Sequence, residues 1–311
     1  MEQPKGCVVP EREKKCIYNK YEDNTCVVIC LYVDDMLIFG TSLEVVCETK
    51  KFLGSKFDMK DLGEEEVILG IEITRTPNKL KLSQEHYVEK ILRKFEHFDC
   101  KPGRLSRYTQ SPNQDHWTVV RRVLKYLRGT INYGLCFSGF PSVLEGFSDA
   151  NWISDSDEMK STSGYVFILG GSVVSWKSTK KTCITRSTME VEFIALEKAS
   201  SEVEWLRNLL ADVPLWTRPA LSLSMRCDSQ AAIAKAKSKI FNGKNRHIRL
   251  RHNIVRQLLE TRVISLEFVR SELNLDDPLT KPLTKKLVEE TSRGMRLMPI
   301  TEVKSGGNPT Y

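Results

Sequence analysis

The chain has 311 residues, of which 41% are hydrophobic and 28% charged, and its formal net charge is +7 at pH 7. This composition is typical of a globular protein with room for two modest domains, and it excludes a predominantly disordered chain. No apolar run approaches the roughly 20 residues of a membrane-spanning helix, and the N-terminus lacks a secretory signal pattern, so we expect an intracellular protein outside the membrane.

The first hundred residues predict a small α+β unit. The segment VVICLYVDDMLIF (27–39) indicates two apolar strands flanking an acidic pair, and helical spacing follows over 43–57. Strands are expected over 66–75 and 79–82 around a turn at Pro77-Asn78, and an amphipathic helix over 84–95. A polar break over 101–113 separates this unit from another helix, expected over 116–128.

From Leu144 onward the pattern predicts a mixed sheet covered by helices. Strands are expected over 145–152, 164–169 and 172–176, followed by a long helix that begins with a capping box at Ser187–Glu190. A strand over 221–227, helices over 229–237 and 247–259, and a strand over 263–269 complete the unit. This order of elements is typical of one mixed sheet with helices packed on it.

The nine cysteines form neither a CxxC pair nor a zinc-binding pattern, which indicates free thiols in a reducing compartment. Basic residues gather over 177–186 and 235–256. Clustered cations suit a phosphate backbone, although charge alone is explained equally well by solvated helix and loop faces.

Four carboxylates fall at the centre or ends of the elements in the second half of the chain: Asp149, Glu192, Asp228 and Asp277. Asp149 lies within a strand among apolar neighbours, where a carboxylate needs a hydrogen-bonding partner or a cation. Alone, Asp228 could be a helix N-cap, and Glu192 and Asp277 could be acids of a first helical turn. Brought together by one sheet, the four acids would form a hard-oxygen pocket suited to two Mg²⁺ ions.

Five motifs follow one another between Leu144 and Lys286: FSDANWISDSDEMKSTSGYVFILGGSVVSWKS, RSTMEVEFIAL, CDSQAAIAKAKS, NRHIRLRHNIVRQLL and DDPLTKPL. In sequence and order they resemble the ribonuclease H domain of copia-type retrotransposon Pol polyproteins. The resemblance implies an α/β (α+β) fold, the ribonuclease H-like mixed sheet with helices, and cleavage of the RNA strand of RNA–DNA hybrids.

Carried over motif by motif, the catalytic and metal-binding acids of this family fall on Asp149, Glu192, Asp228 and Asp277. Glu190 is the alternative to Glu192, and Asp276 is the alternative to Asp277.

The expected cofactor is a pair of Mg²⁺ ions bridged by Asp149, with Mn²⁺ as an alternative. One ion would lower the pKa of an attacking water and the other would stabilise the departing 3′ oxygen, so neither a nucleophilic side chain nor a small-molecule cofactor is needed. The expected partner is an RNA–DNA hybrid, and no membrane. The candidates for binding its backbone are Lys244, Arg246, His247, Arg249 and Arg251.

The segment CLYVDDMLIFG, followed by KFLGSKFDMKDLGEEEVILGIEI, resembles copia-type reverse transcriptase, with Asp34 and Asp35 at the polymerase metal site. That site needs a further Asp from an earlier strand, and no candidate strand precedes Cys26. Residues 1–10 resemble the segment just after the missing acid, and Lys15–Tyr18 follow almost at once where the family has a long stretch. A second excision is expected near Pro102-Gly103. We therefore expect an incomplete palm-like α+β unit without DNA polymerase activity.

The expected domains are a reverse transcriptase remnant (1–101), a connection or thumb remnant (102–143), a ribonuclease H domain (144–286), and a C-terminal helix and tail (287–311). Two functions remain open: a metal-dependent hybrid ribonuclease, and a non-catalytic nucleic-acid-binding relic of a retrotransposon. Only the first predicts stabilisation by Mg²⁺ that Asp149→Asn abolishes. Copia-type polyproteins act in cytoplasmic particles, which favours the cytoplasm over the nucleus.

Overall fold

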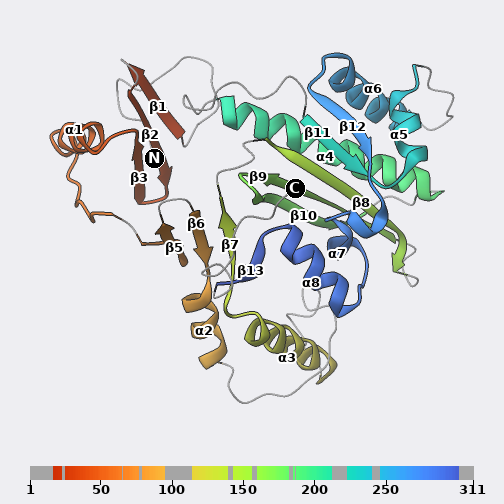
Figure 1. Cartoon of the computed structure of the whole chain (residues 1–311), viewed down its shortest axis with the longest axis horizontal. Coiled ribbons are helices and arrows are strands. Elements are labelled where there is room, and N and C mark those ends of the chain that lie inside the picture. Colours follow the sequence, from red (N-terminus) through yellow and green to blue (C-terminus); the bar gives the residue numbers. More distant parts are fainter. Residues whose placement is uncertain are drawn as a thin grey trace. The chain divides into compact units, whose positions relative to one another are not determined.

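The computed structural model describes residues 17–22, 25–64, 66–76, 79–94, 114–138, 143–155, 160–181, 185, 187–211, 223–239 and 246–300. Four regions discussed above lie outside these ranges: the stretch before Ile17, the break over 101–113, Lys244, and the residues after Ile300. The chain divides into two compact units, one of residues 1–63 with 204–219 and one of residues 64–203 with 220–311 (Figure 1). No helix within the described ranges is long and apolar enough to cross a membrane.

Among the described residues, the first unit contains a three-stranded antiparallel sheet, one complete helix, and residues 204–211 at the end of a long helix. Its elements are β1 (Ile17–Glu22), β2 (Thr25–Tyr32), β3 (Asp35–Gly40) and α1 (Leu43–Gly54). The two apolar strands expected over 27–39 are confirmed as β2 and β3, in which Tyr32 pairs with Asp35. The helix expected over 43–57 is confirmed as α1, and Ser42 caps it by accepting a hydrogen bond from the Val45 N–H. The expectation that no strand precedes Cys26 was wrong, because β2 supplies hydrogen-bond partners for β1 along its whole length.

The second unit contains a five-stranded mixed sheet. Its strands are β8 (Glu145–Asp155), β9 (Lys160–Leu169), β10 (Ser172–Lys180), β11 (Leu223–Cys227) and β12 (Ile264–Phe268). In space they follow the order β10-β9-β8-β11-β12. β8, β9 and β10 pair antiparallel, whereas β11 runs parallel to β8 and β12 runs parallel to β11. The predicted mixed sheet with helices is therefore confirmed.

Helices cover both faces of this sheet (Figure 1). They are α4 (Thr188–Ala211), α5 (Gln230–Lys237), α6 (Arg246–Glu260), the 3-10 turn η1 (Ser271–Leu273), α7 (Asp277–Thr280) and α8 (Lys285–Gly294). Along β9, Val166 belongs to an apolar cluster against which Leu279 of α7 packs, whereas the neighbouring Tyr165 donates a hydrogen bond to Glu202 of α4. Because successive strand residues point to opposite faces, β9 contacts α7 on one face of the sheet and α4 on the other.

The second unit also contains an antiparallel sheet of order β13-β7-β6-β5-β4. Its strands are β4 (Val67–Ile68), β5 (Ile71–Thr76), β6 (Lys79–Ser83), β7 (Tyr133–Phe137) and β13 (Leu297–Pro299). Two helices, α2 (Glu85–Lys94) and α3 (Gln114–Gly129), lie between β6 and β7 in the sequence. The strand expected over 79–82 and the helices expected over 84–95 and 116–128 are confirmed.

The single strand expected over 66–75 was wrong, because the chain turns back at Leu69 and Gly70, both at positive φ (54° and 77°). Glycine adopts positive φ without a steric penalty, so Gly70 suits this tight hairpin.

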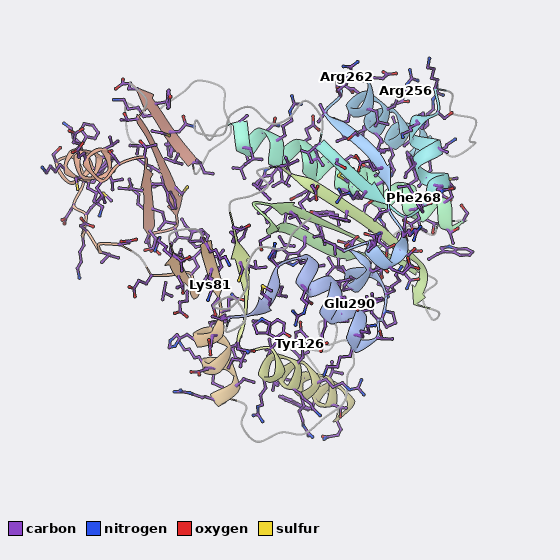
Figure 2. The ribbon with its side chains drawn as sticks, viewed as in Figure 1. Lys81, Tyr126, Arg256, Arg262, Phe268 and Glu290 are labelled. Atoms are coloured by element: carbon purple, nitrogen blue, oxygen red, sulfur yellow. The ribbon has the colours of Figure 1, made fainter. Side chains whose placement is uncertain are left out.

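Two strands of this sheet, β7 and β13, were not predicted. β13 pairs with β7, and Lys81 of β6 (labelled in Figure 2) donates a hydrogen bond from Nζ to the Ile300 carbonyl oxygen at 3.1 Å. β7 also contacts the mixed sheet, because Leu135 packs against its apolar cluster and the Ser138 N–H donates to the Gly170 carbonyl oxygen at 3.0 Å. The chain's last described strand thus pairs with a strand from its first half, β7. The domain boundaries at residues 101, 143 and 286 stay predictions.

Candidate metal centre

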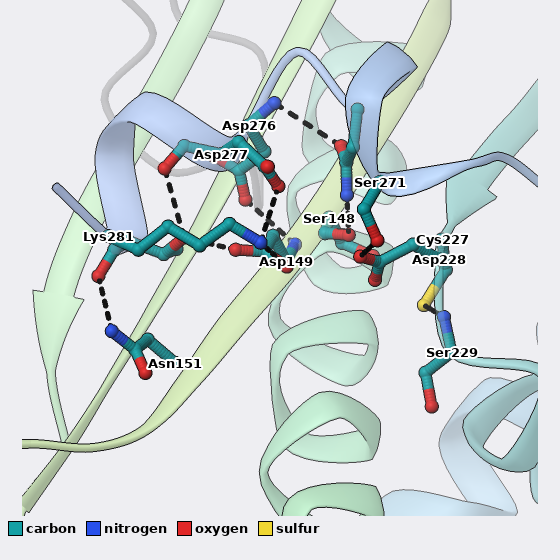
Figure 3. Close-up of polar contacts among 12 residues, drawn as sticks. Ser148, Asp149, Asn151, Cys227, Asp228, Ser229, Ser271, Asp276, Asp277 and Lys281 are labelled. Atoms are coloured by element: carbon teal, nitrogen blue, oxygen red, sulfur yellow. Dashed lines mark hydrogen bonds and ion pairs between the residues drawn. The ribbon is translucent and has the colours of Figure 1, made fainter. Parts of the chain in front are cut away.

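Asp149 lies at the centre of the candidate site, on β8 opposite Gly164 of β9. Its side chain is only 1% exposed. Oδ2 accepts a hydrogen bond from the Thr280 hydroxyl, and Oδ1 lies 3.7 Å from Lys281 Nζ (Figure 3). Burial raises the pKa of Asp149, and the nearby charge of Asp228 raises it further.

Asp228 and Asp277 bring two more carboxylates to Asp149. Asp228 follows β11, Asp277 begins α7, and single carboxylate oxygens of the three residues all lie within 4.8 Å of one another. Asp228 Oδ2 accepts a hydrogen bond from the Ser271 hydroxyl at 2.7 Å (Figure 3). Burial, with the charge of Asp149, raises the pKa of Asp277 to about 6.

The sequence-based expectation that Asp228 caps the next helix was an open alternative, and it is wrong. The N-cap of α5 is Ser229, whose hydroxyl accepts a hydrogen bond from the Ala232 N–H at 3.2 Å. Asp228 is therefore left to face the other carboxylates, so its position is not explained by helix capping.

Glu192 reaches the same region from α4. One of its carboxylate oxygens lies within 4.8 Å of both an Asp228 oxygen and the sulfur of Cys227. Glu192 Oε2 is buried and has no hydrogen-bond partner among the described residues. Burial, followed by the charges of Asp149 and Asp228, raises the pKa of Glu192 to about 9. A carboxylate in these surroundings favours its neutral form, and a nearby cation would stabilise the ionised form.

The two ambiguous positions differ clearly in their surroundings. The Glu190 N–H donates a hydrogen bond to the Ser187 hydroxyl at 3.2 Å, so Glu190 has the capping-box position, whereas Glu192 faces Asp228. Asp276 is fully buried, and its Oδ2 accepts a hydrogen bond from the Asp149 backbone N–H at 2.8 Å. Asp276 thus holds the backbone of β8, while the carboxylate of Asp277 joins the cluster. This geometry favours Glu192 and Asp277 as ligands, and both assignments stay predictions.

The chemistry of this arrangement is that of a cation site. Burial and neighbouring negative charges raise the pKa values of Asp149, Glu192 and Asp277, so their ionised forms are unfavourable unless a positive charge compensates them. Hard divalent cations prefer such oxygen ligands. Asp149, Asp228 and Asp277, with Glu192 beside them, fit a divalent ion better than any neutral ligand.

Sequence reasoning missed the polar residues that surround these acids: Ser271, Thr280 and Lys281. Burial lowers the pKa of Lys281, but the charges of Asp149 and Asp277 outweigh it, so the pKa lies above its usual value. The spacing Asp277–Lys281 (i, i+4) was a usable signal, because residues four apart on a helix are neighbours. The hydroxyls of Ser271 and Thr280 gave no signal in the sequence.

The basic residues proposed to bind a nucleic-acid backbone differ in exposure and in ion pairing. Arg249 is exposed on α6, whereas Arg251 is engaged in an ion pair with the buried Glu197 of α4. Arg246 and His247 lie in the first turn of α6, and Lys244 lies outside the described residues. Arg249 is thus the candidate whose side chain is seen to be accessible.

The polymerase-like acids lie in the other unit. Val33 and Asp34 form the turn between β2 and β3, with Val33 at a φ of 52°, and Asp35 begins β3. Asp34 and Asp35 are both exposed. Within the described ranges they belong to no group of three potential metal ligands.

Comparison with known sequences gives two results. Residues 8–106 match the reverse transcriptase (RNA-dependent DNA polymerase) family. The chain is 31% identical to the retrovirus-related Pol polyprotein from transposon TNT 1-94 of Nicotiana tabacum over 88% of its length, and 27% identical to that from transposon RE2 of Arabidopsis thaliana, also over 88%. It spans only 25% and 22% of the lengths of these relatives.

Among solved structures, the chain is similar to the N-terminal RNase H domain of a Mycobacterium tuberculosis protein. The match covers 49% of this chain and 97% of that domain, at 13% identity and a TM-score of 0.34. At that score the likeness adds no weight, and the fold assignment depends on the strand order described above.

Proposed function

Since the chain is related over most of its length to Pol polyproteins of copia-like retrotransposons, we propose that it contains a divalent-metal-dependent ribonuclease H that cleaves the RNA strand of RNA–DNA hybrids. One observation carries the proposal: Asp149, Asp228 and Asp277, which are far apart in sequence, have carboxylate oxygens within 4.8 Å of one another. Glu192 adds a fourth carboxylate with a buried oxygen that lacks a hydrogen-bond partner among the described residues.

Each residue has a definite part in this function. Two Mg²⁺ or Mn²⁺ ions, when bound, would supply the charge that activates a water and stabilises the departing 3′ oxygen. Asp149 lies between the other ligands, and the Thr280 hydroxyl fixes its orientation. Ser271 does the same for Asp228. A partner hydroxyl that orients a ligand in this way limits its rotation and so helps to preorganise the site.

The hybrid's backbone would contact exposed cations such as Arg249 of α6. Arg251 has a structural part instead, because its guanidinium neutralises Glu197.

We also propose that the chain lacks DNA polymerase activity. The support is that Asp34 and Asp35 have no third potential metal ligand near them in the part of the chain that the structure describes. Nucleotide incorporation on a primed RNA template is the measurement. Incorporation that disappears in Asp34→Asn would contradict this proposal.

The alternative function is a non-catalytic nucleic-acid-binding relic. The length of the relatives favours neither function, since the chain covers about a quarter of them. The two functions differ in their response to metal: a relic binds hybrid equally well in Mg²⁺ and in EDTA, whereas a nuclease is stabilised by Mg²⁺.

The decisive experiment is cleavage of a labelled RNA–DNA hybrid by the full chain in Mg²⁺, with EDTA as the metal-free control. We expect the RNA strand to be cut, and we expect Asp149→Asn and Asp277→Asn to lower the rate by about 100-fold or more, since loss of even an outer partner of a metal site costs about 10–100-fold. The matched pair Glu192→Gln and Glu190→Gln should separate the ligand from the capping residue, with only Glu192→Gln inactive.

Glu289→Gln, an exposed substitution on α8, controls for charge loss elsewhere. If the folded chain does not cut the hybrid but still binds it in EDTA, the relic is the correct function.

A further inference from the structure

Lys281 places an ammonium group within the carboxylate cluster. Its Nζ lies 3.0 Å from Asp277 Oδ1 and 3.7 Å from Asp149 Oδ1 (Figure 3). No other cation in the described ranges lies within ion-pair distance of either carboxylate. Both carboxylates belong to the group of three that could hold a metal. An ammonium and a divalent ion would therefore be attracted to the same oxygens.

The backbone at Lys281 is held firmly, while its side chain reaches solvent. The Lys281 N–H donates to the Asp277 carbonyl oxygen at 3.1 Å, the Ser178 hydroxyl donates to the Leu279 carbonyl oxygen at 2.6 Å, and the Asn151 amide donates to the Thr280 carbonyl oxygen at 3.4 Å. The Lys281 side chain is 31% exposed, against 1% for Asp149 and 5% for Asp277. The ammonium can thus leave the cluster by side-chain rotation alone, whereas the carboxylates cannot.

The charges make the competition unequal. Asp149, Glu192, Asp228 and Asp277 carry up to four negative charges, and a single ammonium compensates only one of them. A divalent ion brings twice the charge and binds carboxylate oxygens directly. Metal binding then displaces the ammonium. The free energy of metal binding is therefore less favourable by the free energy of the two ion pairs that Lys281 loses.

We propose that Lys281 is a positioning residue that competes with divalent metal for Asp149 and Asp277, and so weakens metal binding while holding the carboxylates together before metal arrives. This inference rests on the proposed function, because it concerns the same carboxylates. It adds a specific residue that sets the metal concentration at which the site fills.

The test is the affinity of the full chain for Mg²⁺ alone, by isothermal titration calorimetry, in the parent, Lys281→Met, Lys281→Gln and Lys281→Arg. We expect Met and Gln to bind Mg²⁺ about tenfold more tightly, since an opposite charge at this range shifts a neighbouring carboxylate's proton affinity by about tenfold or more. Lys281→Arg keeps the charge and should bind close to the parent. Lys285→Met, at a side chain that is 91% exposed on α8, is the matched control and should change nothing.

A second readout is the thermal stability of the same variants in EDTA. Lys281→Met and Lys281→Gln should melt at a lower temperature than the parent, because two buried carboxylates lose their ion-pair partner, and Mg²⁺ should restore more of their stability than it adds to the parent. If Lys281→Met does not fold, Lys281→Gln against Lys281→Arg still decides the question.

The outcomes separate this inference from the proposed function. Cleavage by the parent with unchanged or weaker Mg²⁺ affinity in Lys281→Met and Lys281→Gln would overturn the role of Lys281 alone. No Mg²⁺ binding by any variant would overturn the metal-dependent function and this role with it. Tighter Mg²⁺ binding by the neutral variants supports the competition even if the chain cuts no hybrid.

Discussion

Replacing Asp149 by asparagine should have opposite effects on stability with and without metal. The amide side chain would still accept the hydrogen bond from Thr280, but it would carry no charge. In EDTA at pH 8 we expect the variant to be more stable than the parent, because the mutual repulsion of the carboxylates is reduced. In Mg²⁺ we expect the order to reverse, because the variant loses its central ligand.

The magnitude follows from the distances. Carboxylate oxygens of Asp149, Asp228 and Asp277 lie within 4.8 Å of one another, and at a dielectric constant of about 20 a pair of full charges at that distance repels by about 3.5 kcal/mol. The substitution removes two such repulsions and one attraction, to Lys281 Nζ at 3.7 Å, of about 4.5 kcal/mol. The net stabilisation in EDTA is about 2 kcal/mol. In the parent, Mg²⁺ at one hundred times its Kd adds about 2.7 kcal/mol, and the variant should gain none of it, so the parent becomes the more stable of the two.

The pH dependence has a definite sign. The pKa of Asp277 is raised to about 6 and that of Glu192 to about 9, with burial as the main cause and Asp149 a contributor to both. Ionisation of such groups opposes folding, so their contribution to stability is fully present below about pH 4 and is lost as the pH rises towards 9. The advantage of Asp149→Asn in EDTA should therefore be small at pH 4 and grow up to pH 8.

The assay is urea unfolding followed by tryptophan fluorescence, at pH 4, 6 and 8, in EDTA and in Mg²⁺. Glu289→Gln, outside the cluster, should show no such pattern. The reasoning is refuted if Asp149→Asn is less stable than the parent in EDTA at pH 8, because the carboxylates would then not repel one another in the folded chain. It is refuted equally if Mg²⁺ stabilises the variant as much as the parent.

Three further substitutions test the packing around the site. Tyr165→Phe removes the hydroxyl that donates to Glu202 at 3.0 Å, and should cost about 1.5–3 kcal/mol in urea unfolding; the exposed Tyr126→Phe should cost nothing measurable. Gly164→Ala adds a Cβ 2.5 Å from Asp276 Oδ1, and should cost about 1–3 kcal/mol. Asp276→Ala has a cost of its own, because the Asp149 N–H loses its acceptor, but in that background Gly164→Ala should cost much less; additive losses would contradict the contact. Arg251→Ala leaves the buried Glu197 without its ion-pair partner and should lower the melting temperature. Arg249→Ala should leave folding unaffected, but it should lower the affinity for hybrid and make that affinity less dependent on salt concentration.

The sequence by itself predicted most of the local elements and singled out the candidate acids. Apolar runs around an acidic pair are enough to specify the β2–β3 hairpin, since strand pairing across a short turn is a local event. Helical spacing and the Ser187 cap determined the start of α4. A carboxylate within an apolar strand identified Asp149 as unusual, because burial of a charge is unfavourable wherever the strand lies in the fold.

Tertiary structure decided what depends on residues far apart in the chain. β13 has three residues and β7 five, too short for a periodic pattern. β13 is a strand because β7 supplies hydrogen-bond partners across about 160 residues, and β7 is a strand because it lies between β6 and β13. The choice of Ser229 over Asp228 as the helix cap, and of Asp277 over Asp276 as the residue facing the cluster, depends on backbone direction rather than residue type. The ammonium of Lys281 reaches Asp149 only because α7 packs on β8, and no pattern within either segment contains that contact.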